Sequence, residues 1–231
     1  VLFHQSRLAS MGQMIANIAH QWRQPLTSLT LSLFNMKKEA HRKDLKSLDA
    51  IYKNSKNSIK NMSETLENFT DFFKPNKNKS EFLIKDCIEE ALLLLDGTIK
   101  DEKIYIEVIN IDDMKLIGIQ NELTQIFINL IQNSKDAFSL NKITNKKIII
   151  TVKKNKKKTA CISFEDNAGG ISQDIINNIF EPYFTTKHKY QGTGLGLFMS
   201  NMICEQSFNG YMDVTSKNNK SIFKIELPIK G

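Results

Sequence analysis

The sequence predicts an α + α/β fold, in which an antiparallel two-helix hairpin precedes an α/β sandwich. Two observations predict this fold. Apolar residues recur at steps of three and four as far as residue 73, and short runs rich in β-branched residues follow after residue 80. The expected boundaries are 1–74 for the helical hairpin, 75–80 for a polar linker and 81–231 for the α/β domain. A chain of 231 residues is long enough to form both parts.

One stripe of apolar or small residues defines the first expected helix. It consists of Leu8, Met11, Ile15, Ile18, Trp22, Leu26, Leu29, Leu33, Met36 and Ala40. Pro25 falls inside this helix, where it removes a backbone donor and crowds the preceding turn. We therefore expect a kink between Gln21 and Pro25.

A second stripe, whose steps alternate between three and four, defines the next helix as a heptad pattern. It consists of Leu45, Leu48, Tyr52, Ser55, Ile59, Met62, Leu66, Phe69 and Phe73. The residues from His41 to Asp44 form a short polar connection, so we expect the two helices to fold back on each other. Because such a hairpin buries little surface alone, we expect a second copy to complete a homodimeric four-helix bundle.

After residue 80 the pattern changes to that of an α/β layer. Strand-like runs lie at 104–109, 147–153, 159–165, 210–215 and 221–227. Helical stretches lie at 85–99, 120–140 and 193–208. Together these elements predict a mixed sheet with helices over one face.

The composition favours a cytoplasmic protein. Cys87, Cys161 and Cys204 are odd in number and widely spaced among apolar neighbours, which is typical of reduced core cysteines. Part of the net charge of +7 lies in the run 153–158, which we interpret as a solvated hairpin tip rather than a nucleic-acid site. No stretch of eighteen apolar residues is present, so we expect no membrane contact within these residues. Because the first residue is Val1 rather than Met, we expect a fragment of a longer protein.

His20 is predicted to face solvent on the first helix. It lies two residues after Ile18 and two before Trp22, which places it nearly opposite the apolar stripe. An exposed imidazole beside a proline kink is accessible to a large partner. Taken alone, it also fits an incidental surface histidine, which is how we interpret the other three histidines.

Asn129 and Asn133 are four residues apart in the helical stretch 120–140, so they share one helical face. Two amides on one face can offer a carbonyl oxygen to a hard cation and a donor to a phosphate. Taken alone, the pair also fits a polar surface stripe.

Asp166 follows a strand-like run and precedes Gly169 and Gly170. A carboxylate in this position can accept a hydrogen bond from an exocyclic amine, and the glycines let the backbone approach a ring closely. An ordinary turn is the alternative interpretation.

A second glycine-rich segment opens the last predicted helix. It consists of Gly192, Thr193, Gly194, Leu195 and Gly196. Free backbone amides at a helix N-terminus favour a phosphate, through their N–H groups and through the helix dipole. The preceding polar, basic segment can fold over a triphosphate, with Lys187 as a candidate charge partner.

In this order, the motifs make the chain resemble the cytoplasmic core of a two-component sensor histidine kinase over nearly its full length. The stretch 19–26 around His20 resembles the phosphoacceptor box of that family. Asn129 to Asn133 resembles the N box, and Asp166 to Gly170 resembles the first glycine box. The stretch 180–184 resembles the F box, and Gly192 to Gly196 the second glycine box.

The resemblance implies a dimerisation and histidine-phosphotransfer bundle followed by an ATP-binding sandwich of the type shared with gyrase, the Hsp90 chaperones and MutL. It further implies that Asn133 ligates Mg²⁺, that Asp166 contacts the adenine amine, and that a lid before Gly192 covers the phosphates.

The sequence departs from the family pattern in four places. Gln21 stands where an acidic residue usually follows the phosphoacceptor, and Gln21 with Gln24 replaces a pair associated with phosphatase activity. Asp136 stands where many relatives have a basic residue, and Ala168 replaces the first glycine of its box. Because imidazole is substantially neutral near pH 7, His20 can still act as a nucleophile.

The expected function is transfer of the ATP γ-phosphoryl group to His20, followed by transfer to an aspartate on a response-regulator receiver domain. One alternative is a degenerate kinase that acts as a dimeric nucleotide-binding scaffold. Another is a DNA-dependent ATPase of the gyrase type. The related ATPases carry a water-activating glutamate where Asn129 stands, and an amide is no base, so the sequence favours transfer over hydrolysis.

Overall fold

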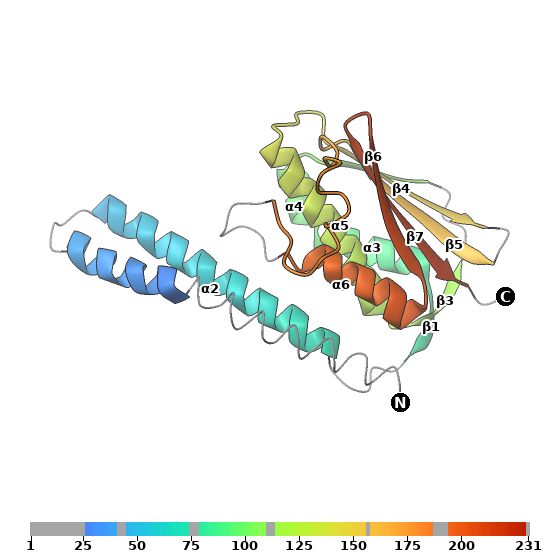
Figure 1. Cartoon of the computed structure of the whole chain (residues 1–231), viewed down its shortest axis with the longest axis horizontal. Coiled ribbons are helices and arrows are strands. Elements are labelled where there is room, and N and C mark those ends of the chain that lie inside the picture. The colour runs from blue at the N-terminus through green and yellow to red at the C-terminus, as the bar shows by residue number, and fades with distance from the viewer. Residues whose placement is uncertain are drawn as a thin grey trace. The chain divides into compact units, whose positions relative to one another are not determined.

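The structure is a computed structural model, which describes residues 26–40, 45–73, 79–109, 114–155, 158–186 and 194–229. The chain separates into a helical unit, described up to Phe73, and an α/β unit, which includes residues 79–184 and 194–229 of the described chain. Figure 1 shows both units. His20 and the predicted kink at Pro25 lie outside the described residues.

The helical unit contains a helix over 26–40 and the long helix α2 (Leu45–Phe73). In α2 no glycine or proline interrupts 29 residues, so the backbone hydrogen bonds can continue without a break. The two helices are separated by residues 41–44, where the sequence predicts the connection. None of the described helices combines the length and the apolar character needed to cross a membrane.

The α/β unit is built on a five-stranded mixed sheet with the order β2-β4-β5-β7-β6. β2 (Tyr105–Ile109) runs parallel to β4 (Lys147–Lys154), whereas the other neighbours are antiparallel. The remaining strands are β5 (Thr159–Asp166), β6 (Tyr211–Lys217) and β7 (Lys220–Pro228). All five strands were predicted within two residues of their observed bounds, and the mixed sheet is confirmed.

One face of this sheet forms the core. Buried and partly exposed residues alternate along β5 and β7, because successive side chains of a strand point to opposite faces. Phe164 and Phe223 are paired across these strands and both are buried. The helices α3 (Ile84–Leu94), α5 (Gln120–Leu140) and α6 (Gly196–Met202) lie over one side of the sheet in Figure 1, as predicted.

Two predicted helices have different bounds in the structure. The stretch 85–99 divides at Leu95 into α3 and α4 (Asp96–Asp101), because aspartate and glycine at 96–97 favour a helix boundary over a helix interior. The stretch predicted as 193–208 begins its helix at Gly196, and after Met202 it continues as the π-helix η1 (Ile203–Ser207).

A two-stranded sheet was not predicted. β1 (Ser80–Leu83) pairs antiparallel with β3 (Lys115–Gly118). Each strand has only four residues, too few for a clear alternating pattern, so the pairing depends on contacts between distant segments. Beside this sheet the ring of Phe82 meets that of Phe208 edge to face, with centroids 6.2 Å apart.

The described residues of the basic run, 153–155 and 158, lie in the β4–β5 hairpin, as expected. The amide of Asn155 donates to the carbonyl of Thr159 at 2.8 Å, and Lys158 donates back to Asn155 at 3.1 Å. Lys153 and Lys154 are exposed, so this charge belongs to a solvated hairpin end.

Candidate functional site

Asp166, the last residue of β5, lies at the centre of the candidate site. Its Oδ1 accepts a hydrogen bond from the amide of Ala168 at 2.9 Å, and its Oδ2 accepts one from Ser134 Oγ at 2.9 Å. The Ser221 side chain donates a further hydrogen bond. Asp166 is only 4% exposed. This burial raises the pKa of its carboxyl above the usual value, and the three donors partly oppose the shift.

The turn after Asp166 depends on two glycines with positive φ, +107° at Gly169 and +77° at Gly170. Asn141, just after α5, donates from Nδ2 to the carbonyl of Ala168 at 2.6 Å. A Cβ atom at Gly169 would lie 2.7 Å from that same nitrogen. The turn therefore needs glycine at these positions for its backbone conformation and its packing, in keeping with the ordinary turn that was the alternative interpretation of the sequence.

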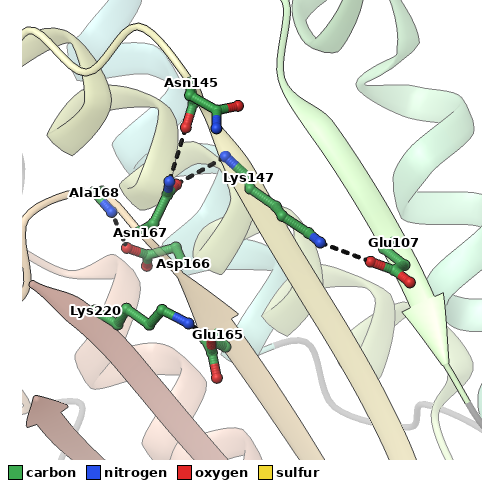
Figure 2. A network of polar contacts seen from close by, with 8 residues as sticks. All are labelled: Glu107, Asn145, Lys147, Glu165, Asp166, Asn167, Ala168 and Lys220. Atoms are coloured by element: carbon green, nitrogen blue, oxygen red, sulfur yellow. Dashed lines mark hydrogen bonds and ion pairs between the residues drawn. The ribbon is translucent and has the colours of Figure 1, made fainter. Parts of the chain in front are cut away.

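Asn167 fixes the same turn to the start of β4. Its Oδ1 accepts a hydrogen bond from the Lys147 amide at 2.8 Å, and its Nδ2 donates to the Asn145 carbonyl at 2.7 Å (Figure 2). Figure 2 also shows the ion pairs Lys147–Glu107, at 2.9 Å, and Lys220–Glu165, at 2.7 Å. The Asn167 hydrogen bonds and the Lys220–Glu165 pair hold the end of β5 from both neighbouring strands, whereas Lys147–Glu107 joins β4 to β2.

Asn129 connects two helices of the site. Its Nδ2 donates to the Gly196 carbonyl and to Ser200 Oγ, both at 3.2 Å, and its Oδ1 accepts from Gln125 at 3.1 Å. The sequence interpretation reserved a donor here for a phosphate, whereas the structure gives this amide partners in the first turn of α6. Asn133 follows one turn later on α5 and is half-buried.

The second glycine segment is described from Gly194 onward, so Lys187, Gly192 and Thr193 lie outside the described residues. Gly194 has a φ of +64°, and its carbonyl accepts a hydrogen bond from the Tyr183 amide at 2.9 Å. Leu195 precedes the first helical residue, Gly196.

Tyr183 has a positive φ of +68°, which is rare for a residue with a side chain. Burial raises the pKa of its phenol to about 12. Because Tyr183 and Gly194 are joined by a backbone hydrogen bond, they bring together the two ends of the segment 184–193. We call this pair the clasp.

Gly194→Ala is expected to lower the free energy of unfolding by about 1–3 kcal/mol. A Cβ atom at this position would lie 2.6 Å from Tyr183 Cα, and alanine disfavours the positive φ. Urea unfolding measures the effect. Gly97→Ala is the matched control: no atom lies within 4 Å of its Cβ position and the residue lies in α4, so this variant should not lower the free energy of unfolding. Equal stability of the two variants would contradict a stabilising role of the clasp.

The polar residues of the site that were missed in the sequence include Ser134, Asn141, Ser216 and Ser221. Ser216 Oγ accepts a hydrogen bond from the Ile171 amide at 2.8 Å and thereby holds the glycine turn from β6. The sequence places Ser134 directly after Asn133 on the same helix, but it does not show that Asp166 is its hydrogen-bond partner. Among the described residues, no group of three His, Cys, Asp or Glu side chains can hold a metal ion.

The structure thus brings together one carboxylate, a glycine turn and the start of α6, all held to α5. Together with a mixed sheet that is covered by helices on one face, these features are typical of nucleotide-binding α/β domains.

Comparisons with known proteins agree with this class. Residues 118–231 match the family described as histidine kinase-, DNA gyrase B- and HSP90-like ATPase, and residues 10–78 match the His Kinase A (phospho-acceptor) domain. The chain is 32% identical to sporulation kinase A of Bacillus subtilis over 234 residues, covering all of this chain and 36% of that protein. It is 28% identical to the two-component sensor PprA of Pseudomonas aeruginosa, covering 97% of this chain and 25% of that protein.

Solved structures of histidine kinases have a similar fold. The catalytic domain of histidine kinase ThkA is similar with a TM-score of 0.58 and 28% identity, covering 66% of this chain and 96% of that one. Histidine kinase ThkA in complex with response regulator protein TrrA has a TM-score of 0.75 and covers 98% of this chain and 64% of that one; at 23% identity it shows the fold alone. The two family matches, which together cover most of this chain, show that it belongs to the histidine kinases and forms the core of a two-component sensor kinase. It spans 25% of the length of PprA and 36% of that of sporulation kinase A.

Proposed function

We propose that this chain transfers the γ-phosphoryl group of ATP to His20 and then to an aspartate of a response-regulator receiver domain. The observation that carries the proposal is the buried Asp166 carboxylate, held by three donors beside the glycine turn. A carboxylate has about four lone-pair directions, so one acceptor position is left for a base amine. Burial around that position makes such a hydrogen bond stronger than in water.

The proposed organisation assigns residues 1–74 to dimerisation and phosphotransfer, 75–80 to a linker, and 81–231 to catalysis. Asp166 and Gly170 would bind the base side of ATP, with Asn129 holding the site in shape. The segment from Gly192 to Gly196, with Lys187, would bind the phosphates. Because the reaction needs little covalent help from the protein, positioning and charge neutralisation would supply most of the rate.

Mg²⁺ would enter together with the nucleotide. The described residues form no acidic cage, and Asn133 offers a single amide oxygen. This donor set fits Mg²⁺, which commonly keeps waters and phosphate oxygens and takes few protein ligands. When bound, the ion would neutralise charge on the phosphates. The protein's own part is the orientation of Asn133 by α5.

Asn129 supports transfer to histidine over hydrolysis. Its side chain accepts from Gln125 and donates to α6, and an amide cannot remove a proton from water. We therefore expect slow steady-state release of phosphate compared with the labelling of the protein itself.

Incubation of the chain with Mg²⁺ and ATP labelled at the γ position tests the proposal. The protein should acquire label that is stable to base and labile to acid, and it should pass this label to one member of a panel of purified receiver domains. Binding of ATP without any labelling would instead support the scaffold alternative, which Gln21 motivates. Rapid phosphate release stimulated by duplex DNA would support the gyrase-type alternative.

The helical unit would form a homodimer. Apolar residues of both predicted stripes are exposed in the single chain: Leu26 by 51%, Leu33 by 66%, Leu45 by 77%, Tyr52 by 57% and Ile59 by 53%. Because large apolar side chains in a regular stripe are costly to leave in water, a second copy is the partner that the stripes fit.

Leu33→Glu is expected to raise the dissociation constant of the dimer by about 100-fold or more. Each leucine buried from water contributes about 1.5–3 kcal/mol, and a symmetric dimer contains the substitution in both copies. Light scattering after size-exclusion chromatography measures the mass at several concentrations. Asn35→Glu, which lies off the stripe and is exposed, is the matched control and should remain dimeric. A monomeric unaltered chain, or a dimeric Leu33→Glu variant, would contradict this interface.

We place the chain in the cytoplasm, where a receiver domain is available. The three cysteines are free, and burial raises the pKa of the Cys87 and Cys204 thiols to about 12, so these thiols stay protonated.

A further inference from the structure

We propose that Ser134 is a positioning residue that sets the preference of the site for a 6-amino over a 6-oxo purine. The inference rests on the proposed function only in that a purine nucleotide binds beside Asp166. It assigns to Ser134, a residue directly after the N-box asparagine, the role of holding one oxygen of the Asp166 carboxylate.

Ser134 is placed so that its hydroxyl holds the Asp166 carboxylate. It lies on α5, is 2% exposed, and its hydroxyl donates to Asp166 Oδ2 at 2.9 Å. The other carboxylate oxygen, Oδ1, accepts from the Ala168 amide at 2.9 Å. Ser221 of β7 is paired with Asp166 in the sheet and supplies the third donor. With three positions filled, rotation of the carboxylate is restricted and its free acceptor position is fixed.

The protonation state of Asp166 then decides which base is accepted. An ionised carboxylate only accepts hydrogen bonds, so it pairs with a 6-amino group and is repelled by a 6-oxo group. A neutral carboxyl group can donate its proton in a hydrogen bond to a 6-oxo oxygen. Preference for adenine therefore requires that Asp166 stay ionised and correctly oriented.

Two opposing effects act on this ionisation. Burial raises the pKa of Asp166, while the hydroxyls of Ser134 and Ser221 and the Ala168 amide lower it. Glu165, on the same strand, also raises it, although its own charge is paired with Lys220 Nζ at 2.7 Å. The residues that face Asp166 from α5, β4 and β7 are Ser134, Ile148 and Ser221, and none is charged. Removal of the Ser134 hydroxyl thus favours the neutral acid.

Competition of ATP and GTP against a fluorescent ATP analogue, between pH 5.5 and 8, tests the inference on the full chain. Ser134→Ala should bind ATP about 10-fold more weakly at pH 7, because a hydrogen bond to a charged group is lost. As the pH is lowered, its ATP-to-GTP affinity ratio should begin to fall at a higher pH than the ratio of the unaltered chain, because the neutral acid forms earlier. Ser134→Thr keeps the hydroxyl and should restore the pH at which the ratio falls.

Ser139→Ala is the matched control, because its hydroxyl donates to the Lys135 carbonyl on an outer face of the same helix. It should leave the ratio and its pH dependence unchanged. Thermal unfolding of each variant confirms that the fold is intact. An unchanged pH dependence in a folded Ser134→Ala variant, or an equal change in Ser139→Ala, overturns the inference alone. Failure of the unaltered chain to bind ATP overturns the proposed function as well.

Discussion

Replacing His20 with alanine is expected to abolish incorporation of label from γ-labelled ATP. Alanine has no nucleophilic nitrogen, so no phosphoryl–nitrogen bond can form, whatever the state of the nucleotide site. Label should fall below detection, which for such an assay is a decrease of about 1000-fold or more. Autoradiography of the protein after base and acid treatment measures it.

The His20→Ala variant should still bind ATP, because the proposed nucleotide site lies in the α/β unit. His41→Ala is the matched control: this histidine lies in the stretch predicted as the polar connection between the helices, and its replacement should leave labelling intact. If His20→Ala retained acid-labile label, another residue would be the acceptor. If His41→Ala lost label equally, the effect would come from the helical unit rather than from the imidazole.

Asp166→Asn is expected to weaken ATP binding by about 100-fold. The amide of asparagine can keep the contacts with Ala168 and Ser134, with its oxygen toward the backbone amide and its nitrogen toward the hydroxyl. The side chain then carries no negative charge toward the base amine. Its NH₂ group can also face that amine, and two donors cannot form a hydrogen bond. Loss of a charge-assisted hydrogen bond together with an unpaired polar group amounts to about 3 kcal/mol. Fluorescence competition with ATP measures the affinity.

The same substitution should not destabilise the protein at neutral pH. Because burial raises the pKa of Asp166 in the folded chain, its contribution to stability is present at low pH and is lost as the pH rises through the folded pKa. Once the pH is high enough to ionise this carboxyl, its buried charge costs stability, and a neutral asparagine does not carry that cost. Urea unfolding at pH 7 should give an equal or higher free energy of unfolding for Asp166→Asn. A large loss of stability would show that Asp166 serves the fold rather than the ligand.

Local residue patterns carried most of the fold prediction. β4, β5 and β7 were predicted because each is a short run rich in β-branched and other apolar residues. The short pair β1 and β3 was missed, since four residues carry no clear period and their pairing joins Ser80 with Gly118 across a long stretch of chain. The start of α6 was placed too early because a positive φ at Gly194 is a property of the folded turn.

The sequence by itself determined the order of the motifs and the residue types in them: an imidazole in a stretch predicted as helix, two amides one turn apart, and a carboxylate before two glycines. Only the tertiary structure decided how these groups are held. The partners of the glycine turn come from residues 32, 27 and 45 positions away, as in Ser134–Asp166, Asn141–Ala168 and Ser216–Ile171. Such hydrogen bonds form between segments that meet only when the sheet and α5 pack together, and no local pattern of residues records which hydroxyl will face which carboxylate.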